Sequence, residues 1–407
     1  MKYAIIIPDG CADWSVESLG GRTPMQAART PNLDALAQTG IVGRSQNVPA
    51  GMSPGSDVAT LGLLGYNPSQ YYTGRAPLEA AAQGIELGLN DWAIRCNLVT
   101  IEEGVMKSFT AGHISSEEAK SLITALNDMA VPHSPIKLQF YSGVSYRNLL
   151  IARDHVPLSV NTQTYPPHDY TDQKIDNVLP SGDGSGLLRD LMETSRQIFE
   201  GHPVNRQRIE AGKLPATQIW LWGIGQKPQL PLFANRFSST SIHGAMITAV
   251  DLLRGIASLI GWEIINVPGI TGYIDTDFSA KGNYAAEALN DYDLVCVHIE
   301  ATDEAGHEGS VAKKVKAMED IDAFVVPPVL DALKSHGDWR LFVSPDHPTP
   351  TAIKTHTSDY VPWILAGSDI TPSTASAPNY DEETARHSSF RYDYGCEMIG
   401  QLFIRNS

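Results

Sequence analysis

The sequence predicts an α/β protein whose sheet is covered by helices on both faces and whose chain is interrupted by a smaller inserted α+β domain. Short continuous apolar runs, typical of strands buried on both faces, lie near the two ends of the chain with helical patterns between them. The middle third is richer in proline and glycine. Because 407 residues exceed the usual size of one domain, we expect a discontinuous α/β domain over 1–90 and 238–407, with the inserted domain over 91–237.

Four apolar runs are predicted strands of the parallel type: "YAIII" (3–7), "LVCVHI" (294–299), "RLFVS" (340–344) and "PWILA" (362–366). Helical spacing of apolar residues predicts a helix over 245–260 that stops at Gly261. Helical character after Ser310 extends until Pro327 and Pro328 interrupt it. In the middle third, "HISSEEAKSLITALNDM" predicts an amphipathic helix, with Ser115 and Glu118 spaced as a capping box.

Charge and cysteine usage exclude several classes of protein. The formal net charge of -16 argues against a nucleic-acid partner or an anionic membrane, since both require a basic surface. The four cysteines form no C-x-x-C pair, which suits a reducing cytoplasm. No apolar run approaches the roughly 20 residues of a membrane helix, and the apolar stretch of "MKYAIIIPDG" is too short for a signal peptide. We therefore expect a cytoplasmic protein; the sequence makes no prediction of its oligomeric state.

Acids and histidines gather where the predicted strands end, which is the edge where open α/β sheets bind ligands. They are Asp9, Asp303, His307, Asp346 and His347 after the first three strands, and His356 just before the fourth. Each alone has an ordinary interpretation, since an aspartate after a strand is more often a cap or turn former. Together they predict metal binding with enough ligands for two cations. Mixed aspartate and histidine ligation suits Mn²⁺ or Zn²⁺ better than Mg²⁺.

Ser56 is the candidate nucleophile. It follows Pro54 and Gly55 at the start of an apolar, helix-like run, where free backbone N–H groups favour an anion. A serine at this place is more often a plain N-cap. A serine oxygen held by a divalent cation is instead a reactive nucleophile, and two cations can stabilise both oxygens of a displacement at phosphorus. The combination fits phosphoryl transfer through a phosphoserine.

The motifs resemble the alkaline phosphatase superfamily, and within it the archaeal type of cofactor-independent phosphoglycerate mutase. The matching segments span most of the chain and include "GMSPGSDVATLGLLGYNPSQYYTGRAPLEAAAQGI", "HIEATDEAGHEG" and "SPDHPTPTAIKTHTSDYVP". Thr302 departs from the expected pattern at a proline position, and the segments "YIDTDFSAKGNY" and "FSSTSIHGAM" match the family less closely. The resemblance implies an alkaline-phosphatase-like sheet, two divalent metal ions (Mn²⁺, with Zn²⁺, Co²⁺ or Mg²⁺ as alternatives), no 2,3-bisphosphoglycerate and no nucleotide. It places one metal on Asp9, Ser56, Asp346 and His347, and the other on Asp303, His307 and His356.

The implied substrate is a small phosphorylated acid, and a phosphoserine intermediate at Ser56 must be kept from water. The inserted domain is therefore expected to close over the substrate and to supply cations for its carboxylate and phosphate. The candidates for binding are Arg95, Arg147, His168, Arg206 and Arg208, with Arg254 and Lys281 from the α/β domain. The candidates for moving hydroxyl protons are His113 and Asp169. Each of these residues also has an ordinary reading as a surface charge.

Three other functions remain open from the sequence. Bacterial chains that resemble this family have been proposed as homoserine kinases, and the absence of a Walker A motif does not exclude such a kinase. A metal-dependent phosphatase would use the same site with poorer closure. A non-catalytic phosphate-binding protein would need a lost ligand or nucleophile, and the sequence has lost neither.

Overall fold

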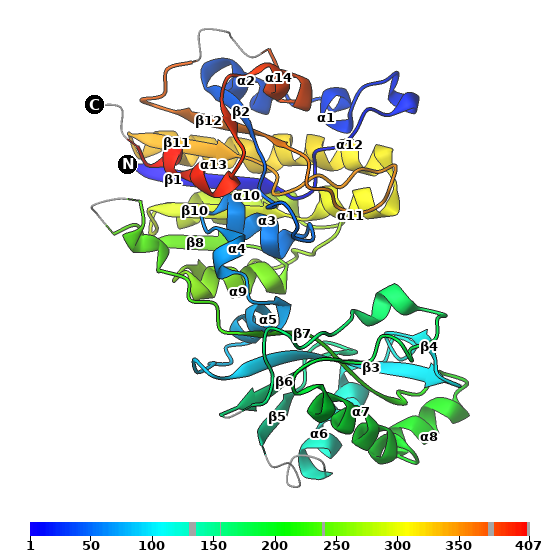
Figure 1. Ribbon diagram of the computed structural model, residues 1–407. Helices are drawn as coiled ribbons and strands as arrows, with labels where there is room; N and C mark the ends of the chain where they lie inside the picture. The colour runs from blue at the N-terminus through cyan, green and yellow to red at the C-terminus, as the bar shows by residue number, and fades with distance from the viewer. Residues whose placement is uncertain (130–135, 155, 238–240, 373–377, 405–407) are drawn as a thin grey trace. The chain divides into compact units, whose positions relative to one another are not determined.

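The computed structural model describes residues 1–129, 136–154, 156–237, 241–372 and 378–404, which form two compact units. The first unit comprises Met1–Tyr72 and Gln229–Ser407, and the second comprises Thr73–Pro228. The predicted α/β class is confirmed (Figure 1). None of the helices in the described ranges is long and apolar enough to cross a membrane.

The first unit is built on an eight-stranded sheet in the order β13-β2-β12-β11-β1-β10-β8-β9. The strands are β1 (Lys2–Pro8), β2 (Ile41–Ser45), β8 (Gly244–Ile247), β9 (Glu263–Ile264), β10 (Leu294–Ile299), β11 (Trp339–Val343), β12 (Val361–Gly367) and β13 (Arg391–Tyr392). Central β1 pairs in parallel with β10 and β11. The three strands predicted over 3–7, 294–299 and 340–344 are therefore confirmed side by side.

Both faces of this sheet are covered. The helices of the unit are α1 (Pro24–Ala27), α2 (Pro31–Thr39), α3 (Ser56–Leu63), α4 (Pro68–Tyr71), α9 (Asp251–Leu259), α10 (Phe278–Ala288), α11 (Ala301–Glu308), α12 (Val311–Asp320), α13 (Val326–Ser335) and α14 (Glu382–His387). Ala4 and Ile6 of β1 share one core with α2, α10 and α13. Tyr3, on the other face, packs its ring 4.9 Å from that of Phe403. Covering on both sides explains why β1 is an uninterrupted apolar run.

Three local expectations were wrong. The strand predicted over 362–366 exists as β12, but it runs antiparallel to β11. Residues 245–247, expected as helix, belong to β8, which pairs with β10. A short apolar run fits either state, and pairing in the sheet decides between them. Pro327 and Pro328 do not end a helix, because the chain continues from α12 through a π-helix (Ile321–Val325) into α13, whose first turn contains both prolines.

The second unit has an antiparallel sheet of β3 (Trp92–Glu102), β4 (Val105–Ser108), β5 (Lys137–Tyr141), β6 (Arg147–Arg153) and β7 (Gln218–Gln226). Its helices are α5 (Arg75–Ala82), α6 (Ser116–Met129), α7 (Ser185–Phe199) and α8 (Pro203–Glu210). The capping box of α6 is confirmed: the Ser115 N–H donates to Glu118 (2.9 Å) and the Glu118 N–H donates to the Ser115 hydroxyl (3.2 Å).

The unit boundaries differ from the expected 90/91 and 237/238. At the first boundary, α5 packs Ala76 and Ala80 against Leu149 and Ile151 of the second unit. At the second, the Phe233 N–H donates to the carbonyl of Ile260 in the first unit (2.9 Å). Residues 73–90 therefore belong to the second unit and residues 229–237 to the first, because each segment makes its contacts within that unit.

A candidate metal centre and nucleophile

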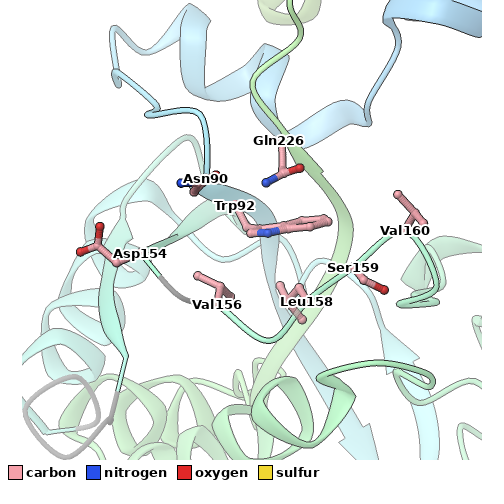
Figure 2. Close-up of a pocket in the computed structure, with 8 residues that line it drawn as sticks. All are labelled: Asn90, Trp92, Asp154, Val156, Leu158, Ser159, Val160 and Gln226. Carbon is pink, nitrogen blue, oxygen red and sulfur yellow. The ribbon is translucent and has the colours of Figure 1, made fainter.

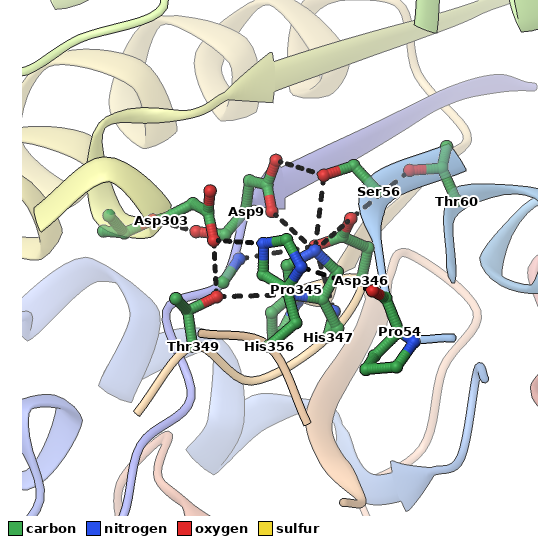
Figure 3. Close-up of polar contacts among 12 residues, drawn as sticks. Asp9, Pro54, Ser56, Thr60, Asp303, Pro345, Asp346, His347, Thr349 and His356 are labelled. Carbon is green, nitrogen blue, oxygen red and sulfur yellow. Dashed lines mark hydrogen bonds and ion pairs between the residues drawn. The ribbon is translucent and has the colours of Figure 1, made fainter. Parts of the chain in front are cut away.

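The predicted ligands meet at one edge of the eight-stranded sheet (Figure 3). Asp9 follows β1, α11 with Asp303 and His307 follows β10, and Asp346 with His347 follows β11. Carboxyl ends of parallel strands share an edge. His356 precedes its strand, yet it lies at the same edge because β12 is antiparallel.

Asp9, Asp346 and His347 form the first ligand group. One ligand atom of each lies within 4.8 Å of the others. His347 Nε2 is 3.5 Å from Asp9 Oδ1 and 3.5 Å from Asp346 Oδ2. All three side chains are at most 1% exposed, so water cannot compensate their charges.

Asp303, His307 and His356 form the second ligand group. Asp303 Oδ2 lies 3.2 Å from His307 Nε2, and Asp303 Oδ1 lies 3.4 Å from His356 Nε2. Positions 303 and 307 share one face of α11, as their spacing predicts. His347 also comes within 4.8 Å of Asp303 and His356, so the two groups are contiguous.

The histidine rings are oriented by backbone acceptors. His307 Nδ1 is 3.0 Å from the Lys354 carbonyl oxygen, and His356 Nδ1 is 3.3 Å from that of Pro54. A carbonyl only accepts, so both rings carry their proton on Nδ1. Both Nε2 atoms then face Asp303, which is the position from which a histidine binds a metal.

Electrostatics of the metal-free centre favour a cation. Burial, reinforced by Asp346 and Asp303, raises the pKa of Asp9 well above its usual range. Burial alone would raise the pKa of Asp303, but hydrogen bonds from His307 and His356 outweigh it and hold that pKa low. Asp9 Oδ1 is buried without a hydrogen-bond partner among the described residues. An orphaned carboxylate oxygen facing lone pairs and further carboxylates is the environment a divalent cation fits.

Ser56 lies at the first ligand group. Gly55, not Ser56, is the N-cap of α3, and Ser56 is the first helical residue. Its hydroxyl is 3.2 Å from Asp9 Oδ2 and 3.3 Å from His347 Nε2. The hydroxyl therefore points at the ligands from a helix N-terminus, where negative charge is favoured.

Sequence reasoning missed His298, the buried partner of Asp9. The Val250 N–H donates to the Thr248 hydroxyl oxygen (3.1 Å), and this hydroxyl lies 3.1 Å from His298 Nδ1. The Asp9 carboxylate accepts, so His298 Nε2–H donates to Asp9 Oδ2 (2.9 Å), and the neutral ring leaves Nδ1 to accept from the Thr248 hydroxyl. Burial lowers the pKa of His298 to about 3, so the ring is neutral. A histidine inside an apolar strand gives no signal of this role in a single sequence.

The carboxylate of Glu300 was also not predicted. With Asp9 and Asp303 it forms a third group of ligand atoms within 4.8 Å. Burial, with the charge of Asp303, raises its pKa to about 8.

Three of the predicted substrate-side residues lie close together in the second unit. The Arg95 guanidinium is 4.0 Å from the Trp222 ring centroid and pairs with Glu79 (3.0 Å). The ring of His168 packs edge-on to the same tryptophan (5.5 Å) and lies 3.6 Å from Asp169. Arg75, which was not predicted, adds positive charge near His168, whose pKa is lowered by burial and by the two arginines.

Arg147 lies on the same face of the sheet as Arg95. Arg95 of β3 faces Leu149 of β6, and Arg147 precedes Leu149 by two residues. Side chains two residues apart along a strand share a face. His113 and Arg206 are exposed elsewhere in this unit, and His113 has a positive φ of 53°.

The other predicted substrate-binding residues have structural partners. Arg208 is 2% exposed and donates to the Ala111 carbonyl (2.6 Å) and to Glu118 (2.7 Å), so it ties α8 to α6. Lys281 is fully buried and donates to the His298 carbonyl (3.1 Å). Arg254 donates to Asn266 Oδ1 (2.8 Å). Each of these three charged side chains therefore has a partner within the protein, and none of them needs a substrate to account for its position.

A pocket of about 600 Å³ lies elsewhere in the second unit, beside Trp92, Asp154 and Leu158 (Figure 2). None of the predicted site residues lines it.

Comparisons with known proteins agree on one family. A family model described as 2,3-bisphosphoglycerate-independent phosphoglycerate mutase matches residues 37–205. The chain is 48% identical over 403 residues to a Methanosarcina barkeri protein of that name, covering 99% of both. A solved structure from Pyrococcus horikoshii gives a TM-score of 0.81 at 26% identity, covering 98% of this chain and 96% of that one. A solved cofactor-independent phosphoglycerate mutase from Thermoplasma acidophilum gives 0.68 at 25% identity, covering 99% of this chain and 100% of that one.

Proposed function

The chain belongs to the 2,3-bisphosphoglycerate-independent phosphoglycerate mutase family, and we propose that it interconverts 3-phosphoglycerate and 2-phosphoglycerate with Ser56 as the phosphoryl carrier. The observation that carries this proposal is the position of the Ser56 hydroxyl, 3.2 Å from Asp9 and 3.3 Å from His347 at the head of α3. A half-buried serine among metal-type ligands is the arrangement that transfer through a phosphoserine needs. The reaction is a step of glycolysis and gluconeogenesis, which suits a cytoplasmic location.

Two divalent cations, Mn²⁺ by preference, fit the ligand groups of this centre. We assign one to Asp9, Ser56, Asp346 and His347, and the other to Asp303, His307 and His356. When bound, such cations supply positive charge that stabilises the phosphoryl oxygens and lowers the pKa of a serine hydroxyl. The orphaned Asp9 oxygen and the inward Nε2 atoms support this assignment.

The phosphoryl group is transferred in two steps. In the first, the phosphorus bond to the C3 oxygen of the substrate breaks as a bond to Ser56 Oγ forms; the serine loses its proton and the C3 oxygen gains one. In the second, the C2 hydroxyl oxygen attacks the phosphoserine, loses its proton and releases Ser56 as the alcohol. Asp169 and His113 are our candidates for carrying the hydroxyl protons.

The glycerate must be retained between the two steps, and the cations of the second unit are suited to hold it. Arg95 and Arg147, with Arg75 nearby, present positive charge on one side of the sheet, and His168 lies beside them. Bidentate arginine contacts are well matched to carboxylate and phosphate oxygens. We propose that the unit over Thr73–Pro228 closes over the substrate and excludes water, with Arg206 as a further candidate contact. Arg208, Arg254 and Lys281 have weaker support because other groups already bind them.

The decisive experiment uses metal-stripped protein reloaded with Mn²⁺ and given 3-phosphoglycerate free of 2,3-bisphosphoglycerate. ³¹P NMR follows 2-phosphoglycerate and inorganic phosphate, with Ser56→Ala as the matched variant. We expect 2-phosphoglycerate from the wild type and none from the variant. Inorganic phosphate alone would identify a phosphatase. Product from ATP and homoserine, with none from 3-phosphoglycerate, would identify a kinase.

A further inference from the structure

Thr349 lies between the two ligand groups. It is fully buried, and its hydroxyl contacts Asp303 Oδ1 of the second group and lies 3.3 Å from His347 Nδ1 of the first. These contacts come from one side chain in the turn that follows β11 (Figure 3).

The proton positions in the two hydrogen bonds of Thr349 follow from which partner can donate and which can only accept. A carboxylate only accepts hydrogen bonds, so the single hydroxyl proton of Thr349 points at Asp303. The hydroxyl oxygen is then an acceptor for His347, whose proton must lie on Nδ1. His347 Nε2 is left as a lone pair, and it faces Asp9 and Asp346 (3.5 Å each).

His307 and His356 show the same arrangement with other acceptors. Backbone carbonyls of Lys354 and Pro54 receive their Nδ1 protons. The Pro348 carbonyl also interacts with the His347 ring and could compete with the threonine. A variant without the hydroxyl distinguishes the two acceptors.

The surroundings of Thr349 hold it in one place. A Cβ at Gly10 would lie 2.4 Å from the Thr349 hydroxyl oxygen, and a Cβ at Gly306 would lie 2.7 Å from its methyl group. The Thr349 N–H lies 3.2 Å from the Ala12 carbonyl oxygen. Two glycines therefore leave the space that this side chain occupies, and any larger residue at either place would displace it.

We propose that Thr349 is a positioning residue that keeps the Nε2 atom of His347 free for a cation and joins the two ligand groups through Asp303. The inference rests on the metal-binding part of the proposed function and is independent of the substrate. Partners of this kind typically change metal affinity about 10- to 100-fold when they are removed.

The first experiment determines which ring nitrogen of His347 carries the proton in metal-free protein. Protein labelled with ¹⁵N-histidine is stripped of metal, and a two-bond ¹H–¹⁵N correlation spectrum shows which nitrogen of His347 carries the proton; His347→Gln assigns the signal. We expect Nδ1–H in the wild type and in Thr349→Ser, and a shift towards Nε2–H in Thr349→Val. Thr100→Val is the matched control, because it removes a buried threonine hydroxyl that donates to the Pro215 carbonyl in the second unit (2.6 Å).

Calorimetric titration with Mn²⁺ gives the second readout. We expect Thr349→Val to raise the Kd about 10- to 100-fold and Thr349→Ser to stay near the wild type. A wild-type His347 with its proton on Nε2 overturns the proposal even if Thr349→Val does not fold. So does a Thr349→Val protein with the wild-type tautomer and Mn²⁺ affinity. Neither outcome depends on turnover of 3-phosphoglycerate, so failure of the proposed reaction remains a separate result.

Discussion

His307 and His356 place their Nε2 atoms 2.9 Å apart although 49 positions separate them in the chain. Both rings donate from Nδ1 to backbone carbonyls, so two lone pairs face each other in the neutral state. Without a metal a proton must lie between them, and because the Asp303 carboxylate accepts a hydrogen bond from His307, the pKa of His307 is raised to about 9. With a metal, the cation replaces that proton.

Metal binding is expected to stabilise the fold. At a free Mn²⁺ concentration of about 100 times its Kd, the free energy of unfolding should rise by about 2.7 kcal/mol per site. Differential scanning calorimetry with and without EDTA measures this. Asp9→Asn should lose the share of the first site, about half of the total increase for two sites. Without metal this variant should be at least as stable as the wild type, because it removes the costly charge of Asp9. Equal stabilisation of wild type and variant would argue against Asp9 as a ligand.

His298 is expected to act through Asp9. His298→Phe keeps the buried ring volume but removes the N–H that fixes Asp9 Oδ2, and the Kd for Mn²⁺ should rise about 10- to 100-fold. His298→Gln retains a donor and should recover part of the affinity. Isothermal titration calorimetry compares the three proteins; an unchanged Kd in His298→Phe would mean that Asp9 is oriented by other contacts.

Arg147 is expected to bind substrate. A hydrogen bond to a charged group contributes about 1.5–3 kcal/mol, so Arg147→Ala should lower kcat/KM by about 10- to 100-fold. The control is Arg196→Ala, another exposed arginine of the second unit, which pairs only locally with Glu193 across one helical turn. Steady-state kinetics with 3-phosphoglycerate distinguish them, and the proposed contact is wrong if both variants lose the same activity.

Glu382 is expected to make stability depend on pH. Burial raises its pKa from about 4.5 to about 7, although it accepts hydrogen bonds from the Thr23 hydroxyl (2.6 Å) and the Asp13 N–H (3.0 Å). A carboxyl whose folded-state pKa is raised contributes stability that is complete below its unfolded pKa and is lost as pH rises through the folded pKa. The loss should be on the order of 3 kcal/mol between pH 4.5 and 7.

Glu382→Gln should remove that change. Urea unfolding at several pH values measures the difference in unfolding free energy between wild type and variant. We expect the difference to shift against the wild type as pH rises through this window. A difference that stays constant would mean that Glu382 ionises as it does in the unfolded chain.

Much of the centre was predictable because strand ends and ligand residues are local features. Apolar runs at 3–7, 294–299 and 340–344 predict strands, and the acids and histidines that follow them meet at one edge because β1, β10 and β11 are parallel. The four-residue spacing of Asp303 and His307 predicts a shared helical face. The ordinary interpretation of Ser56 as an N-cap was excluded only when the structure placed Gly55 there.

Residues that act through contacts distant in sequence could not be found in this way. His298 is the one polar residue of an otherwise apolar strand, and only folding brings it to Asp9, 289 positions away. Arg208 looked like a substrate-binding arginine in "HPVNRQR", but its partners are backbone carbonyls and Glu118 of α6. Such roles depend on contacts between segments that are far apart in the chain, and a single sequence does not show those contacts.

By itself, the sequence determined the α/β class, the ligand residues of the candidate centre and the family to which the chain is similar, because these depend on residue type and short spacing. Tertiary structure alone decided that β12 is antiparallel and so brings His356 to the ligand edge. It also decided which ring nitrogens face inward, and that the Thr349 hydroxyl lies between Asp303 and His347. These depend on hydrogen-bond directions between segments that only the folded chain brings within reach.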